Sequence, residues 1–189
     1  YSQLGKTVHP LAKPREFMSL AQLVAELEGI GDVAADYATF SGVGEPTLAS
    51  NLGEAIAAVK STSHLPVAVL TNSSLMPRED VRWQLAQAHV VVAKLDVASE
   101  ELFHVINNPL PNFRLVEIIE GITRFREEYG GKLALQMMFV ETNKNCAAEM
   151  ARIARGLSPD EVQLNTPLRP CAAEPLSRQE MDSIKQQFT

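Results

Sequence analysis

Two glycines, a glutamate and a proline stand close together in residues 41–47, SGVGEPT. Gly42 and Gly44 carry no Cβ, so the backbone there can approach a ligand closely. Pro46 stiffens the turn, in which the Glu45 carboxylate and nearby carbonyls could accept hydrogen bonds from a ligand ammonium. A plain strand-to-helix turn is the alternative, and a glycine pair alone would favour it. The order Gly-Glu-Pro favours a binding role.

Two further polar segments follow apolar runs, and both could contact a ligand. Thr71 and Asn72 could meet a carboxylate or a sugar hydroxyl, although turn formation and capping explain them nearly as well. Asn165 and Arg169 follow a later run. A planar guanidinium can clamp a carboxylate or phosphate, and an ordinary surface arginine is the alternative.

Lys94 and Asp96 alternate with apolar neighbours, which places two charges on one face of an expected strand. Charges in an apolar core are costly, so we expect them to line a wet cavity. Pairing with each other is the alternative. Neither the cysteines, Cys146 and Cys171, nor the histidines have the spacing of metal ligands, and the sequence identifies no catalytic side chain.

The elements that must position these residues alternate between strand and helix. Apolar runs rich in β-branched residues predict five strands, at 37–40, 66–70, 90–95, 133–140 and 162–164. Amphipathic spacing predicts helices at 20–27, 52–60, 78–88, 115–129, 147–157 and 178–188, with a short one at 100–106. Consecutive apolar residues, as at 90–93, are typical of strands covered on both faces, so the sheet is predicted to be parallel.

Strand-helix-strand repeats of this length cross over right-handedly, which allows a closed barrel, an open doubly wound sheet or a partial barrel. Five strands are too few for closure, and an opening strand is expected to be absent. In such folds ligands gather beyond the carboxyl ends of the strands. All the candidate residues lie there, so we expect Gly44, Thr71, Asp96 and Asn165 at one edge of the sheet.

Length and composition indicate one globular domain over residues 1–189. The net charge of −6, with both signs interspersed, provides no basic stripe and disfavours nucleic acid as a partner. No segment approaches the roughly 20 apolar residues of a membrane helix, and the N-terminus has no signal pattern. We therefore expect a cytoplasmic protein without a membrane partner.

Five segments, taken in order, resemble radical S-adenosylmethionine (SAM) proteins, in particular the iron–sulfur oxidoreductase branch near the wyosine-synthesis enzymes. They are residues 1–7 (YSQLGKT), 40–48 (FSGVGEPTL), 69–75 (VLTNSSL), 93–96 (AKLD) and 162–166 (VQLNT). The likeness covers nearly the whole chain. The Gly-Glu-Pro element is moderately specific alone, and its occurrence in register with the other four segments is strong.

The resemblance implies a TIM-like partial (β/α)6 barrel with a mostly parallel sheet, here without its first strand and cluster loop. In the intact parent it implies SAM, a [4Fe–4S] cluster, and reductive cleavage of SAM to a 5′-deoxyadenosyl radical. Carried over by position, the loop with Gly42, Gly44, Glu45 and Pro46 would meet the methionine amino group. Further contacts would come from Thr71 and Asn72 near the methionine, Lys94 and Asp96 near the ribose, and Asn165 and Arg169 closing the pocket.

The sequence departs from the family at the cluster ligands. Three cysteines in a CxxxCxxC loop hold the family's cluster, and here Ser2 stands where the third is expected. A serine hydroxyl is a poor substitute for a thiolate, so we expect no cluster on this chain and favour a fragment of a longer enzyme. An engineered chain or a degenerate homologue are the other origins. A cluster-free domain that binds a small molecule or acts as a scaffold is the alternative function, and an inactive α/β domain is a third.

Overall fold

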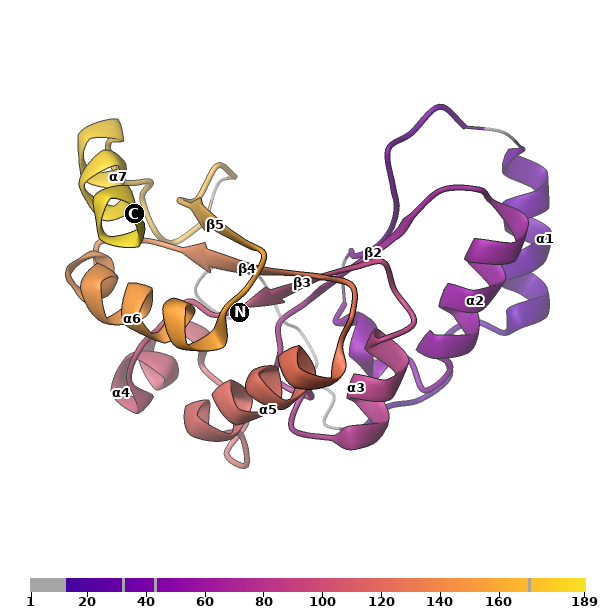
Figure 1. Cartoon of the computed structure of the whole chain (residues 1–189), viewed down its shortest axis with the longest axis horizontal. Helices are drawn as coiled ribbons and strands as arrows, with labels where there is room; N and C mark the ends of the chain where they lie inside the picture. Colours follow the sequence, from indigo (N-terminus) through magenta and orange to yellow (C-terminus); the bar gives the residue numbers. More distant parts are fainter. Residues whose placement is uncertain (1–12, 32, 43, 170) are drawn as a thin grey trace.

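The computed structural model describes residues 13–31, 33–42, 44–169 and 171–189. Within them, five strands form one sheet (Figure 1): β1 (Ala38–Phe40), β2 (Val67–Thr71), β3 (Val90–Lys94), β4 (Lys132–Met138) and β5 (Glu161–Asn165). Every neighbouring pair is parallel, and the order in the sheet follows the order in the chain. The predicted strands and the predicted parallel sheet are confirmed.

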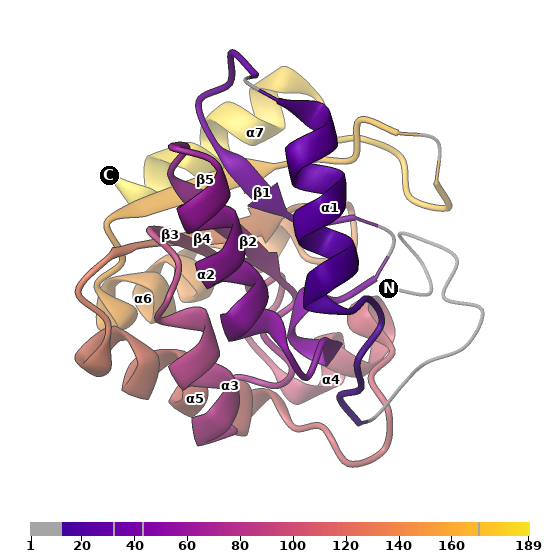
Figure 2. The ribbon, with the colours of Figure 1, turned by 90° about the vertical axis from the view of Figure 1, so that its right-hand side faces the viewer.

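Helices connect the strands and flank the sheet. The longer ones are α1 (Leu20–Ile30), α2 (Leu52–Thr62), α3 (Glu79–Leu85), α5 (Leu115–Glu128), α6 (Ala147–Leu157) and α7 (Arg178–Lys185). A short α4 (Glu100–Leu102) continues into a π-helical turn, η2 (Phe103–Asn107). Single 3-10 turns are η1 (Pro46–Leu48), η3 (Lys144–Cys146) and η4 (Gln186–Phe188). Figure 2 shows α1 beside α2 at the β1 end of the sheet.

Local capping explains where several helices begin. Ser99 and Ser177 cap α4 and α7 through their hydroxyl groups, as their sequence positions predict. The predicted helix 78–88 is shorter in the structure, because Arg78 is the extended N-cap of α3 and Pro77 lies in the preceding turn. None of the described helices is both long enough and apolar enough to cross a membrane.

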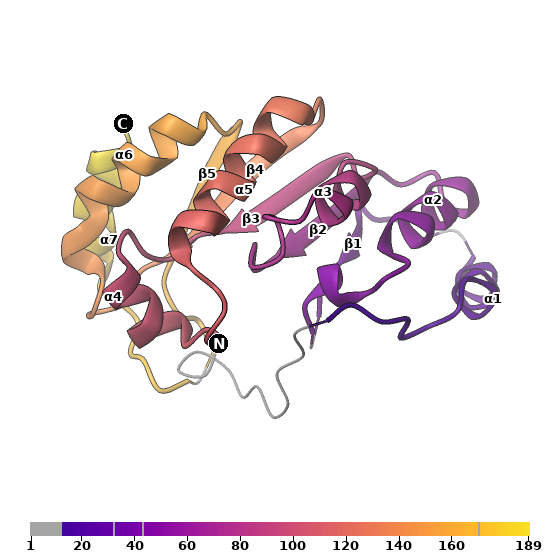
Figure 3. The ribbon, with the colours of Figure 1, turned by 90° about the horizontal axis from the view of Figure 1, so that it is seen from below.

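The two faces of the sheet carry different residues. Figure 3 shows α2, α3, α5 and α6 along one face. The side chains of that face are apolar and at most 3% exposed: Val67, Val69, Val91, Ala93, Leu95, Leu133, Leu135 and Met137. The opposite face carries Lys94, Gln136 and Gln163, which lie in register on three adjacent strands. The core therefore lies between sheet and helices, and the opposite face also carries polar side chains.

The helix-covered side of the sheet is closely packed where α5 crosses the turn that precedes α3. A Cβ on Gly121 of α5 would lie 2.6 Å from the carbonyl carbon of Met76, so only glycine allows this approach. Arg82 is buried in the same corner, where its guanidinium donates to the Met76 and Pro77 carbonyls and to Glu128. This packing holds the turn between β2 and α3 against α5.

Candidate functional site

The polar residues that follow the strands lie at one edge of the sheet, because all five strands run in the same direction. Two contacts show how closely the neighbouring ends approach. Thr71 Oγ1, at the end of β2, donates to Glu45 Oε1 at 2.6 Å. The amide of Phe139, just after β4, donates to the carbonyl of Asn165 at 2.7 Å. The predicted shared edge is therefore confirmed as an arrangement, independently of what binds there.

Glu45 ties the β1 loop to the end of β2. Its Oε1 accepts from the Thr47 amide at 3.1 Å, the Thr47 hydroxyl at 2.7 Å and the Thr71 hydroxyl. Its Oε2 accepts from the amide of Asn72 at 2.7 Å. Oε1 has about two lone pairs and already meets three donors, so any further donor must approach Oε2, which accepts one hydrogen bond. The structure thus gives Glu45 a bracing role that its sequence position did not predict.

The loop before Glu45 presents open backbone. Gly42 and Gly44 are exposed, and a Cβ added to either would meet no atom within 4 Å. Gly42 has a φ of 143°, which L-residues rarely adopt, whereas Gly44 has no such constraint. Val43 lies outside the described residues. Pro46 begins the turn η1 and directs the chain back toward α2.

In the turn after β2, the short side chains form the turn-stabilising hydrogen bonds that were the alternative to ligand contacts. Thr71 Oγ1 accepts from the amide of Ser73 at 3.1 Å, and Asn72 Oδ1 accepts from that of Ser74 at 2.9 Å. Ser73 is fully buried with a left-handed φ of 66°, and its hydroxyl has no partner among the described residues. Such strain is tolerated where the surroundings fix the backbone, as they do at this edge.

Lys94 and Asp96 pair with each other. Their sequence positions had allowed this pairing as the alternative to lining a wet cavity. Lys94 Nζ lies 3.4 Å from Asp96 Oδ2, and Asp96 is 2% exposed. Asp96 also accepts from the amide of Met138 at 2.9 Å and from Asn107 Nδ2 at 3.4 Å. Burial raises the pKa of the Asp96 carboxyl, and the Lys94 charge opposes that rise. Asp96 therefore joins β3 to β4.

Asn143 is a buried member of the edge that our sequence analysis missed. Its side-chain amide donates to the carbonyls of Asp96 at 2.7 Å and Met138 at 2.9 Å, and its Oδ1 accepts from the Val140 amide. It thereby holds the ends of β3 and β4 together. The signal was available, because residues 141–145 (ETNKN) are a polar run directly after the fourth strand.

The end of β5 is more open. Asn165 is half-buried at the last position of the strand. Arg169 lies further along the loop and is exposed, next to Leu168 at 92% exposure. No hydrogen bond or ion pair joins Arg169 to another residue in the part of the chain that the structure describes. The structure therefore does not bring Arg169 into the network that holds the other candidates.

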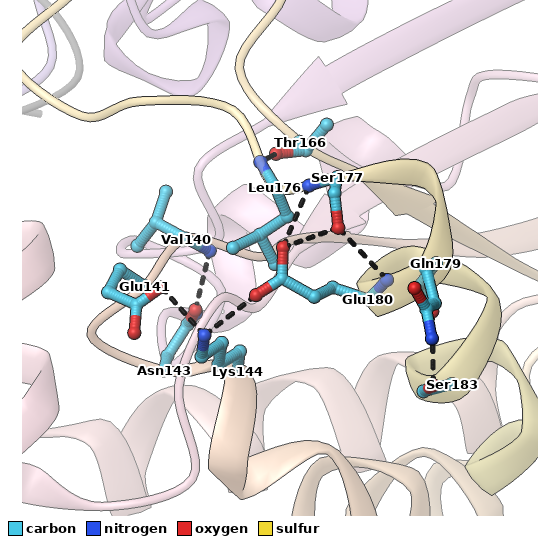
Figure 4. A network of polar contacts seen from close by, with 10 residues as sticks. All are labelled: Val140, Glu141, Asn143, Lys144, Thr166, Leu176, Ser177, Gln179, Glu180 and Ser183. Atoms are coloured by element: carbon cyan, nitrogen blue, oxygen red, sulfur yellow. Dashed lines mark hydrogen bonds and ion pairs between the residues drawn. The ribbon is translucent and has the colours of Figure 1, made fainter.

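The C-terminal helix is attached to the same edge through an ion-pair network (Figure 4). Lys144, next to Asn143, lies 2.7 Å from both Glu141 and Glu180. Glu180 also accepts from the amide and hydroxyl of Ser177, which completes a capping box at the start of α7. The hydrogen bond from Lys144, followed by those from Ser177, lowers the pKa of Glu180 to about 2.

Acid should loosen α7 before it unfolds the sheet. The folded pKa of Glu180 is about 2 and its reference value is 4.5, so the ionised carboxylate stabilises the folded chain above that reference value. This contribution is lost as the pH falls from about 4.5 toward 2. In thermal melts between pH 6 and pH 2, Tm should fall less steeply in Glu180→Gln than in the wild type. Glu174→Gln, at an exposed glutamate of the preceding loop, is the matched control and should follow the wild type. An equal dependence of Tm on pH in Glu180→Gln and the wild type would contradict the stabilising role of the Glu180 carboxylate.

No family model matches the sequence. A UPF0026 protein of Synechocystis sp. is 35% identical over 183 residues, which cover 95% of this chain and 67% of the relative. The chain belongs to the UPF0026 family. A second UPF0026 protein, from Methanocaldococcus jannaschii, is 33% identical over 177 residues, covering 90% of this chain and 55% of the relative. The chain thus spans between about half and two thirds of these two relatives.

Solved structures show the fold of this UPF0026 chain. TYW1 with a lysine-pyruvate adduct superimposes with a TM-score of 0.70 at 14% identity, over 89% of this chain and 59% of TYW1. A domain of pyruvate-formate lyase-activating enzyme from Bacteroides vulgatus gives 0.62 at 15% identity, over 80% and 91%. A radical SAM methyltransferase from Sphaerobacter thermophilus gives 0.62 at 20% identity, over 89% and 53%. The predicted unclosed partial barrel is therefore confirmed.

The positions of the cysteines and other metal-ligating residue types bear on whether the UPF0026 chain can hold an iron–sulfur cluster. Among the described residues, no three histidine, cysteine, aspartate or glutamate side chains converge in a way that could hold a metal ion. Cys146 and Cys171 are both half-buried free thiols, and Cys171 Sγ donates to the carbonyl of Ala173 at 3.2 Å. Ser2 lies outside the described residues. The described residues therefore do not fit an iron–sulfur cluster.

Proposed function

We propose that this chain carries the SAM-binding edge of a radical SAM enzyme. The observation that supports it most is the set of polar strand ends at one edge of a partial barrel similar to those of radical SAM enzymes. In the intact parent a [4Fe–4S] cluster would supply the electron that cleaves SAM. Because the described residues do not fit a cluster, the proposal for this chain is limited to holding SAM in place.

The residues present fit the amino-acid end of SAM. Above Gly42 and Gly44 there is open space, so the methionine ammonium can approach backbone carbonyls and Glu45 Oε2. Asn72 can present its side chain from the neighbouring strand end, since only its Oδ1 is engaged, by Ser74. On this proposal Thr71 acts through Glu45, which it orients, and does not touch the ligand.

The ribose end would lie over β3 and β5. Lys94 and the half-buried Asn165 offer donors and an acceptor there, and ribose hydroxyls can both donate and accept, whereas the side chain of Asp96 is fully buried and acts through Lys94. Arg169 would reach the pocket only if its exposed loop moved inward. A cluster-free scaffold is favoured by one observation, the four internal hydrogen bonds of Glu45, which show that this edge also has a bracing role.

Calorimetry with SAM and S-adenosylhomocysteine tests the proposal. Without cluster contacts the binding should be weak, with Kd of order 1 mM, about −4 kcal/mol. Gly44→Val should abolish measurable binding without unfolding the chain, because its side chain would fill open space on the approach surface. Gly130→Val is the matched control, since Gly130 is equally open but follows α5 at the other end of the strands.

A longer chain that adds a cysteine-bearing upstream segment should bind at least about tenfold more tightly, a difference of about 1.4 kcal/mol. The proposal would be wrong if Gly44→Val and Gly130→Val bound SAM equally well. Equal affinity with and without the upstream segment would favour the scaffold or metabolite-binding alternative.

A further inference from the structure

The face of the sheet opposite α2, α3, α5 and α6 carries two glutamine side chains in register. Gln136 of β4 and Gln163 of β5 are paired positions, and Gln136 Nε2 donates to Gln163 Oε1 at 3.3 Å. Gln163 Nε2 in turn donates to Glu161 Oε1 at 2.9 Å. These bonds fix the orientation of both amides. Neither glutamine belongs to the SAM contacts proposed above.

The oriented amides have donors and acceptors left over. No described residue donates to Gln136 Oε1, and each Nε2 carries a second N–H. The buried side-chain polar atoms without a partner, within the described residues, are Ser73 Oγ and Asn107 Oδ1. Gln136 Oε1 is not among them, and Gln136 is half-buried, so this acceptor is not fully enclosed by the described residues. The pair presents an acceptor beside a donor at a spacing set by adjacent strands.

The charges on this face are matched by opposite charges. Lys94 lies 3.4 Å from Asp96, and Glu161 lies 2.5 Å from Lys132. A carboxylate only accepts hydrogen bonds, and an ammonium only donates, so neither complements an acceptor beside a donor. A carboxamide presents both groups on one planar edge. The chemistry of the face thus favours a neutral amide over an ion.

The surroundings of the amides are those of an enclosed face and not of an ordinary solvated sheet. Ala68, Val92 and Ala134 share this face, and they are only 7%, 7% and 1% exposed. A freely solvated face would expose such small side chains much more. The face therefore combines apolar walls with a few oriented polar groups, as small-molecule sites do.

We infer that Gln136 and Gln163 bind a carboxamide group of the enzyme's substrate. The inference rests on the proposed function, because it takes this face as the place where a substrate lies beside SAM. The two amides would pair with one planar amide edge of the ligand, while Lys94 and Asp96 stay engaged with each other. The substrate class is accordingly a neutral compound with a primary or secondary amide.

Side-chain amide signals in ¹H–¹⁵N spectra of the full chain provide the test, with acetamide and acetate as probes. The signals of Gln136 and Gln163 are assigned from their loss in Gln136→Met and Gln163→Met, whose thermal melts check folding. Acetamide should shift both signals saturably, with Kd of order 10 mM, and acetate should bind at least about tenfold more weakly because it lacks a donor. The response of Gln163 should disappear in Gln136→Met and persist in the matched control Gln87→Met, on the distant α3–β3 connection.

Two results would overturn the inference. One is acetate binding as tightly as acetamide, and the other is an acetamide response that survives in Gln136→Met or never saturates. Titration of the wild type with SAM separates this inference from the function on which it rests. If acetamide binds selectively and SAM does not bind, the amide site stands and the SAM assignment fails. If SAM binds and acetamide does not, only the carboxamide assignment fails.

Discussion

Asp96→Ala should destabilise the chain by about 3–5 kcal/mol, the usual cost of breaking a buried ion pair by removing one partner. The carboxylate is 2% exposed and accepts from the Met138 amide, Asn107 and Lys94. Alanine leaves the Met138 amide without its acceptor and removes the Asp96 charge beside Lys94. Urea unfolding followed by circular dichroism should show the loss as a lower midpoint with an unchanged m-value.

Asp96→Asn is the matched control. It keeps an acceptor for the Met138 amide but removes the charge that faces Lys94, so it should cost about 1–2 kcal/mol less than alanine. Burial raises the pKa of Asp96 in the folded chain, and the Lys94 charge offsets only part of that rise. The stability that comes from this raised pKa is fully present below the pKa of Asp96 in the unfolded chain. It is lost as the pH rises through the pKa of Asp96 in the folded chain. Asp96→Asn should therefore remove that part of the pH dependence. Equal destabilisation by alanine and asparagine would contradict the role of the hydrogen bond.

Glu45→Ala should destabilise the chain by about 2–4 kcal/mol, because it removes a charged acceptor from four donors. The hydroxyl groups of Thr47 and Thr71 are most affected, since both residues are at most 4% exposed and would lose their partner. Urea unfolding measures the change. Glu127→Ala, at an exposed position of α5, is the control and should change stability by less than about 0.5 kcal/mol.

The Glu45 result also decides how binding data are interpreted. Weaker SAM binding by Glu45→Ala could follow from a loosened edge alone, so Gly44→Val is the cleaner binding variant. A Glu45→Ala chain as stable as the Glu127→Ala chain would show that the bracing role is wrong. In that case the carboxylate would be available to a ligand on both oxygens.

The fold was largely predictable because its strands are short, apolar and separated by amphipathic segments. Runs such as 90–93 are apolar on consecutive positions, and both faces of β3 are indeed little exposed there. Helix ends were less predictable. Pro77 is compatible with a helix start, but the chain uses it in a turn and caps α3 with Arg78.

The roles of the edge residues could not be deduced in the same way. Sequence places Lys94 and Asp96 on one face, but only the structure shows that they pair with each other and that Asp96 holds the Met138 amide. The bracing role of Glu45 depends on a contact with Thr71, 26 residues away along the chain. Asn143 lies in a polar run directly after the fourth strand, but its role depends on the Asp96 carbonyl, which is 47 residues away along the chain and is brought within reach only by the fold.

Mapping of SAM by ¹H–¹⁵N spectroscopy tests the central claim most directly, because it locates the ligand on the sheet without any variant. On titration, backbone amide shifts should concentrate at the carboxyl ends of the strands, with Gly42, Gly44, Asn72 and Asn165 among the largest. His64 and His89 lie at the opposite ends of the strands, where His89 Nδ1 accepts from the Val67 amide, and their amides should stay unchanged. Shifts centred on His64 and His89, or no saturable shift at the strand ends, would contradict the account.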